Sequence, residues 1–195
     1  MRKYFILCLV LVFLTSAVNE VNAWWWSDDT PYVTSENTNE RAAEDIIRDV
    51  WGSTSRRAGE ETPITRVVSI KSIPQADGTQ TLDMRINIDG ATEHGVLMGI
   101  LMHINKLFPR LLAEEKLNDY NEFRLYGSLP MKDQRGNVKE DWVSKVFFTR
   151  KAIQEVSWDK IDTIDLHDVL SKMNDGKDCT YWIHGGILSR IKWLQ

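Results

Sequence analysis

Strict alternation of apolar and polar side chains over residues 80–89 constrains the fold of this chain more than any other feature. The apolar set is Leu82, Met84, Ile86 and Ile88, and every residue between them is polar. A period of two predicts a strand with one buried face and one solvent face. Residues 64–73 alternate more loosely, and Ala76-Asp77-Gly78 between the two runs is typical of a hairpin turn.

Residues 91–108 carry the helix that should cover the buried face. Leu97, Leu101, Ile104 and Phe108 follow helical spacing, and a second apolar stripe makes this segment the expected buried centre of the domain. Proline lacks a backbone N–H, so we expect Pro109 to kink or restart the helix before 110–117.

The remaining elements complete an α+β pattern. A first helix is expected at 40–51, with a cap at residues 37–39 and an end at Gly52. Strands are expected at 122–130 and 138–149. Two late helices are expected near 150–156 and 158–173, capped by Thr149 and Ser157. The order predicts an antiparallel sheet of about four strands, with a central buried helix and further helices on one face.

Residues 1–23 have the three-part layout of a secretory signal peptide. Arg2 and Lys3 precede an apolar run from Tyr4 to Leu14, and Val21-Asn22-Ala23 suits the cleavage site. The run is shorter than the roughly 20 residues that span a bilayer. An uncleaved N-terminal anchor is the alternative. We therefore expect an exported protein, periplasmic or extracellular, with a polar and aromatic arm at 24–39 and one domain at 40–195.

Charge and cysteine content exclude several classes of partner. The whole chain has a net charge of −4, and removal of a positively charged signal leaves it more acidic, so no nucleic-acid partner is expected. Membrane contact is limited to the transient signal peptide or to peripheral contact. Cleavage also removes Cys8, which leaves Cys179 alone and rules out an internal disulfide. Cys179 is either buried or available to link two copies into a dimer.

The densest polar cluster lies between residues 159 and 184. His167, Asp165 and Asp168 could serve acid–base or metal chemistry, or could simply form a solvated helix face. His184 opens a His-Gly-Gly run similar to the oxyanion loops of some esterases, but the chain has no G-x-S-x-G motif. A small exported hydrolase or metal-binding protein that uses this cluster is the alternative function.

His94, Met98 and Met102 share helical spacing of four in the central helix. Thioether ligands select Cu(I), so the stripe is a candidate copper site, although methionines on a central helix more often fill gaps in the core. No pattern in the sequence requires a cofactor.

Tryptophans gather at both ends of the expected mature chain, and we interpret them as candidate binding residues. They are Trp24, Trp25, Trp26, Trp182 and Trp193. Tryptophan combines a large apolar ring with a polar N–H, so these rings either form a binding surface or fill the core. Strong core patterns without an assembled active site favour a non-enzymatic accessory or binding protein of unknown ligand over an enzyme. Its expected partner is a protein or an envelope component.

One segment resembles uncharacterised bacterial proteins. The resemblance lies in Leu125-Tyr126-Gly127-Ser128-Leu129-Pro130, Asp133, Gly136-Asn137 and the run from Ile153 to Trp158-Asp159. It covers about a fifth of the chain, and its shared positions are interpreted as turn and core residues, which carry fold and not chemistry. The resemblance implies a bacterial origin and assigns no activity.

Overall fold

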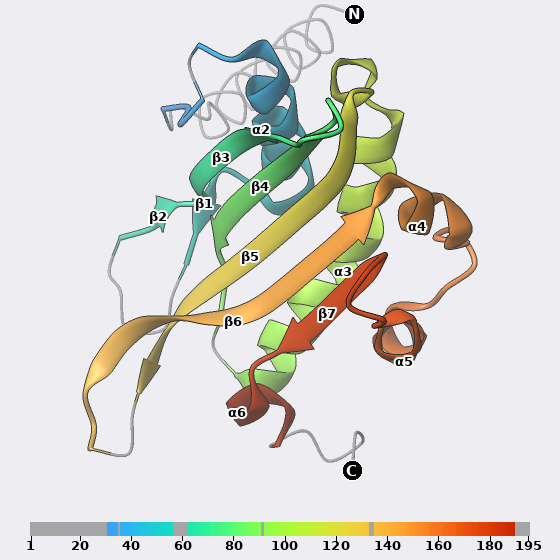
Figure 1. Ribbon diagram of the computed structural model, residues 1–195. Helices are drawn as coiled ribbons and strands as arrows, with labels where there is room; N and C mark the ends of the chain where they lie inside the picture. Colours follow the sequence, from blue (N-terminus) through green and yellow to red (C-terminus); the bar gives the residue numbers. More distant parts are fainter. Residues whose placement is uncertain (1–30, 35, 57–61, 91, 133–134, 190–195) are drawn as a thin grey trace, which may run out of the picture. The chain divides into compact units, whose positions relative to one another are not determined.

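A mixed sheet backed by helices makes up most of the described chain (Figure 1). The computed structural model describes residues 31–34, 36–56, 62–90, 92–132 and 135–189. Its helices are α2 (Thr38–Trp51), α3 (Glu93–Ala113), α4 (Arg150–Glu155), α5 (Thr163–Met173) and α6 (Gly185–Leu188), with a 3-10 turn η1 (Glu115–Leu117). Its strands are β1 (Thr54–Ser55), β2 (Ile64–Thr65), β3 (Val67–Pro74), β4 (Gln80–Asn87), β5 (Tyr120–Lys132), β6 (Val138–Thr149) and β7 (Cys179–Ile183).

The main sheet has five strands in the order β3-β4-β5-β6-β7, and β1 and β2 form a separate pair. The α+β class is confirmed, but the expected antiparallel sheet of about four strands is only roughly matched. β4 and β5 run parallel, and β7 adds a fifth strand. The parallel pair has a simple cause: α3 returns the chain along the sheet, so β5 starts opposite the start of β4, with Tyr120 paired to Gln80.

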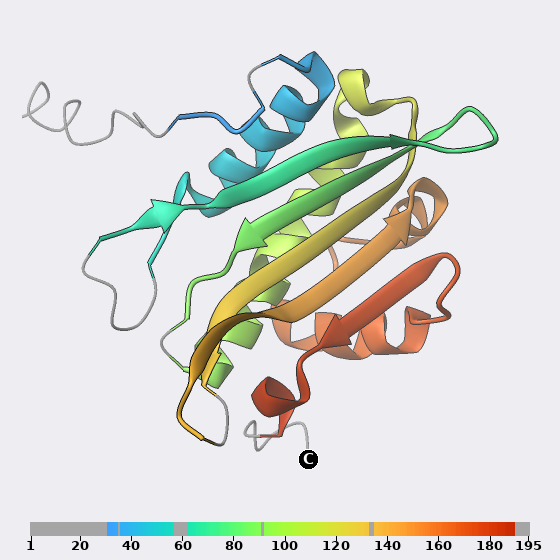
Figure 2. The ribbon, with the colours of Figure 1, turned by 60° about the vertical axis from the view of Figure 1, so that its left-hand side comes forward.

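All the helices that contact the sheet cover one face of it. α3 packs across that face with α2 on one side and α5 on the other, as Figure 2 shows behind the strands. In β4, Thr81 and Asp83 on the opposite face are also buried. The apolar residues that the alternation predicted to be buried are buried, namely Leu82, Met84, Ile86 and, just after β4, Ile88. They meet the apolar stripes of α3, whose buried members are Val96, Leu97, Ile100, Leu101, Ile104, Leu107, Phe108 and Leu111. α3 alone in the described chain is long and apolar enough to cross a membrane, and this burial accounts for its composition.

Two predicted helix boundaries are wrong for physical reasons. α3 continues through Pro109 to Ala113. The proline removes only one backbone donor, and the burial of Phe108 and Leu111 on either side of it stabilises the helix across this position. α5 begins after Asp162 instead of Ser157, since the residues after Ser157 form a turn closed by the Lys160 N–H. The other predicted caps are confirmed: Asn37 and Thr149 accept backbone N–H bonds at the starts of α2 and α4, and Gly52 ends α2 with a φ of 82°.

A buried carboxylate holds the start of the described chain against α2. Glu44 is fully buried and accepts hydrogen bonds from the backbone N–H groups of Val33 and Thr34 and from the Thr34 hydroxyl at 2.6 Å. The Arg48 guanidinium lies 3.0 Å from the same carboxylate. Burial alone would raise the pKa of Glu44, but these donors outweigh it and lower the pKa. Glu44 is therefore ionised and holds Val33 and Thr34 against α2. The compact unit around the sheet begins at Tyr32.

The outer edge of β7 is capped by the turn that precedes it. Asp175 accepts a hydrogen bond from the Cys179 N–H at 3.0 Å, and Asn174 accepts one from the Tyr181 N–H at 3.0 Å. These two N–H groups point away from β6 and would otherwise be open to another strand. The turn therefore occupies two of the backbone donors at this edge, those of Cys179 and Tyr181.

The opposite edge, β3, is capped in a different way. Its Ser72 N–H donates to Glu40 of α2 at 2.7 Å, its register shifts around Val68, and it ends in Pro74, which has no N–H. Such features prevent regular pairing with a further strand. The surface that the sheet leaves available is consequently its face and not its edges.

Candidate functional site

The face of the sheet opposite the helices carries two rows of side chains that cross all five strands. We call this surface the open face, and no described element covers it (Figure 2). Strand register defines the first row as Ser69, Arg85, Tyr126, Lys145 and Trp182, and the second row as Lys71, Asp83, Arg124, Phe147 and Thr180. Each row takes one residue from each strand, so neighbours in a row are one strand spacing apart.

The first row alternates cations with aromatic rings. The Arg85 guanidinium carbon lies 5.8 Å from the centroid of the Tyr126 ring, and the Lys145 ammonium lies 5.2 Å from that of Trp182. Both distances are within the range of a cation–π contact. Arg85 is 47% exposed and Trp182 is 40% exposed, so both residues are accessible from solvent.

The second row adds charge to the same surface. Arg124 donates to Glu122 at 2.7 Å, which raises the pKa of its guanidinium, and its guanidinium carbon lies 5.7 Å from the Phe147 ring centroid. Asp83 accepts a hydrogen bond from the Arg85 Nε at 3.3 Å.

Donors without an acceptor remain on this surface. Within the described chain, the two terminal amino groups of Arg85 have no hydrogen-bond acceptor, and the Lys145 ammonium has no carboxylate partner. The open face also presents the cations Lys71 and Arg124. It is thus rich in cationic donors although the whole chain has a net charge of −4.

A β-bulge brings a further aromatic ring to the open face. The register of β5 and β6 shifts between Gly127 and Ser128, so Val143 has no partner and Trp142 pairs with Ser128. The shift turns Val143 into the core and Trp142 outward, where its ring centroid lies 5.5 Å from that of Tyr126. Without the extra residue, the alternation of β6 would place Trp142 in the core.

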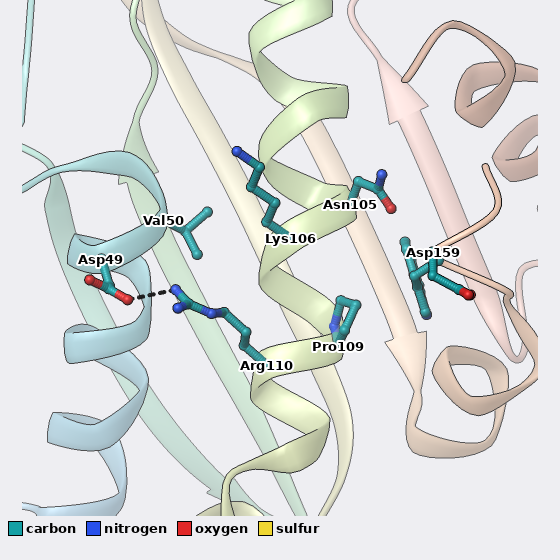
Figure 3. Close-up of a pocket in the computed structure, with 8 residues that line it drawn as sticks. Asp49, Val50, Asn105, Lys106, Pro109, Arg110 and Asp159 are labelled. Carbon is teal, nitrogen blue, oxygen red and sulfur yellow. Dashed lines mark hydrogen bonds and ion pairs between the residues drawn. The ribbon is translucent and has the colours of Figure 1, made fainter. Parts of the chain in front are cut away.

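A groove on the helical side is a second candidate site (Figure 3). It has a volume of about 640 Å³ and lies among α2, α3 and the segment after α4, with lining residues Asp49, Val50, Asn105, Lys106, Pro109, Arg110, Trp158 and Asp159. The volume suits a small ligand. However, Arg110 is already paired with Asp49 at 2.7 Å, and the lining cations and carboxylates balance in number. The groove therefore has no charge preference that would select a class of ligand.

The predicted His/Asp cluster is divided by the fold. His167 lies in α5, and its Nδ1 is 2.7 Å from the hydroxyl of Tyr181, a core residue. Burial lowers the pKa of His167, while Asp165 and Asp168 on the same helix are exposed to solvent. No three His, Cys, Asp or Glu side chains in the described part of the chain gather as metal ligands.

The His-Gly-Gly run has a structural role in this fold. His184 is the N-cap of α6, and its Nδ1 accepts a hydrogen bond from the Gly186 N–H at 3.0 Å. Cys179 lies in β7 and is 2% exposed, and burial raises the pKa of its thiol to about 12. An intermolecular disulfide through Cys179 would thus require β7 to open first.

The His/Met stripe lies on the surface of α3. His94 is exposed, Met98 is half-buried, and Met102 is 42% exposed. The expectation that the methionines fill core gaps is therefore wrong for Met102. The second histidine of α3, His103, stacks on Trp51 with ring centroids 4.5 Å apart, on a different side of the helix from His94.

Of the five tryptophans predicted to bind, Trp182 lies on the open face, and Trp24, Trp25, Trp26 and Trp193 fall outside the described residues. The neighbours of Trp182 on the open face were not predicted from the sequence. Arg85 is on the polar face of the alternating strand, a signal that was present, whereas Tyr126 was expected in a turn or the core and is half-buried on the open face.

Comparison of the chain with protein-family models, with curated proteins and with solved structures finds no match in any of the three. The resemblance of residues 125–159 to uncharacterised bacterial proteins stays a prediction.

Proposed function

We propose that this chain is an exported, non-enzymatic binding protein whose open face docks an acidic segment of a partner protein. The observation that carries the proposal is the first row of the open face, where Arg85, Tyr126, Lys145 and Trp182 alternate cation and ring across four adjacent strands. The proposal includes export to the periplasm or cell exterior, for which residues 1–23 supply the support.

The composition of the open face supports a protein partner. Tryptophan, tyrosine and arginine dominate the residues that carry binding energy at protein interfaces, and the open face presents all three types together. Side chains occupy backbone donors at both edges of the sheet, which disfavours the addition of a strand, so side-chain contacts on the face are the better source of affinity.

The charge of the open face supports an acidic partner. Arginine and lysine groups that lack acceptors can donate charge-assisted hydrogen bonds to carboxylates. The rings beneath them exclude water and strengthen these contacts. Complementary charge also raises the association rate and makes it depend on salt.

A titration with poly-L-glutamate tests the proposal, with poly-L-lysine as the opposite-charge control. The double variant Arg85→Gln/Lys145→Gln should weaken binding of poly-L-glutamate at least about tenfold, because it removes two charge-assisted contacts. The matched control Lys116→Gln/Lys172→Gln removes the same charge from exposed positions on the helical elements and should leave the affinity within about twofold.

Three results would count against the proposal. They are no binding of poly-L-glutamate at low salt, equal losses in the two double variants, and preferential binding to dextran sulfate or to phosphatidylglycerol vesicles. The last result would assign the open face to a polysaccharide or a membrane. Export has a separate test: N-terminal sequencing of the protein recovered from the periplasm of a bacterial host should begin at Trp24.

A further inference from the structure

The spacing of the first row restricts the shape of the segment that can lie on it. Neighbouring strands are about 4.8 Å apart. Arg85 and Lys145 lie two strands apart in the row, so the Cα positions from which the two cations extend are about 9.6 Å apart. Tyr126 and Trp182 are also separated by two strands, which gives the two rings the same repeat, offset by one strand.

A polyproline II helix has the same repeat. It has three residues per turn and rises about 3.1 Å per residue, so every third side chain returns to one face after about 9.3 Å. An extended β-strand repeats on one face after about 6.7 Å, which places its second acidic side chain over Tyr126 instead of Lys145. The α-helix reaches the same face after seven residues and about 10.5 Å, a poorer match.

We propose that the open face selects a proline-rich acidic segment in the polyproline II conformation, with a carboxylate at every third residue. The inference rests on the proposed function and names its partner class. The carboxylates would meet Arg85 and Lys145, and the prolines between them would pack against Tyr126 and Trp182. Aromatic surfaces bind polyproline II segments well because the ligand is already ordered and loses little entropy on binding.

Isothermal titration calorimetry with peptides of fixed composition tests the proposal. The periodic peptide contains three Glu-Pro-Pro triplets in tandem, and the clustered peptide contains the same residues as three glutamates followed by six prolines. The periodic peptide should bind at least about tenfold more tightly, because only its carboxylates can reach both cations at once. A third peptide, with glutamine for glutamate, measures the contribution of charge.

Single variants test the individual positions. Arg85→Gln, Lys145→Gln and Trp182→Ala should each weaken binding of the periodic peptide about five- to tenfold and reduce its advantage over the clustered peptide. Ile164→Ala is the control, since Ile164 is exposed on α5, on the helical side of the sheet and away from the open face. Melting curves of all four variants establish that each one folds.

The outcomes separate this inference from the proposed function. If poly-L-glutamate binds but the periodic and clustered peptides bind equally, the polyproline II inference is wrong and the acidic partner stands. If the glutamine peptide binds as tightly as the periodic peptide, the argument from charge fails for both the polyproline II inference and the proposed function. If neither poly-L-glutamate nor any peptide binds, both proposals fail.

Discussion

Substitution of Gly127 by alanine tests the geometry that shapes the open face. Gly127 lies in β5 at the bulge that turns Trp142 outward. A Cβ at this position would lie 2.5 Å from the Ser144 Oγ and 2.7 Å from the Ile88 Cγ1. Ordinary carbon contacts are about 3.5–4.0 Å. The φ of Gly127 is not positive, so steric conflict and not backbone strain decides the outcome.

The expected cost follows from the burial of the two neighbours. Ser144 is 1% exposed and Ile88 is 2% exposed, so neither side chain can swing into solvent. Overpacking of this kind costs about 1–3 kcal/mol of unfolding free energy. Alanine loses less conformational entropy on folding than glycine, which offsets about 0.5–1 kcal/mol of that cost. Because both neighbours are buried, we expect a cost in the upper half of the overpacking range, about 2–3 kcal/mol, so the net loss of unfolding free energy should be about 1–2.5 kcal/mol, or about 2–10 °C in Tm for a domain of this size.

Gly99→Ala is the matched control in the same protein. No atom lies within 4 Å of a Cβ at Gly99, which sits inside α3. Alanine is the better helix former by about 1 kcal/mol, so this variant should be more stable than the parent protein. Urea unfolding followed by tryptophan fluorescence measures both. A Gly127→Ala variant as stable as the parent protein, or a destabilised Gly99→Ala variant, would refute the packing argument.

Further expectations concern charge and burial. Glu44→Gln should cost about 3 kcal/mol of unfolding free energy, because it removes the buried negative charge that pairs with the Arg48 guanidinium and accepts a hydrogen bond from the Thr34 hydroxyl; an unchanged urea midpoint would contradict this. Burial lowers the pKa of His103 and His167 from the ordinary 6.5, so the unfolded chain takes up protons first as the pH falls. Stability should hold above about pH 6.5 and decline below it until the folded pKa values are passed, and a double glutamine variant should flatten this decline in urea titrations. The Cys179 thiol should react with a thiol reagent only after unfolding, and rapid labelling of the native protein would refute its burial.

Local periodicity predicted the elements of this fold well. The alternation of β4 identified its buried apolar residues correctly, although Thr81 and Asp83 on the other face are buried as well, and the stripes of α3 identified the helix that covers the apolar face. These predictions succeed because side-chain direction repeats within a few residues. The sequence also predicted the helix caps Asn37 and Thr149 and the helix end at Gly52, because caps and helix ends depend on residues that are close in the chain.

The parts that depend on distant neighbours could not be predicted. The parallel pairing of β4 and β5 depends on the path of the long connection between them, and the residues of β7 carry no clear alternation to mark a strand. The bulge after Gly127 follows from the pairing of two strands, and it alone decides which face Trp142 occupies. The candidate site was accordingly visible only as the isolated residue Trp182.

The capped edges of the sheet have a consequence for how such a protein behaves at high concentration. A broad surface of rings such as Tyr126 and Trp182 favours aggregation, and open sheet edges would let that attraction grow into ordered fibres. Asp175 and Asn174 at one edge, and Glu40 at the other, occupy three of the backbone donors that such growth would use. Growth of such fibres from either edge would first have to break these hydrogen bonds.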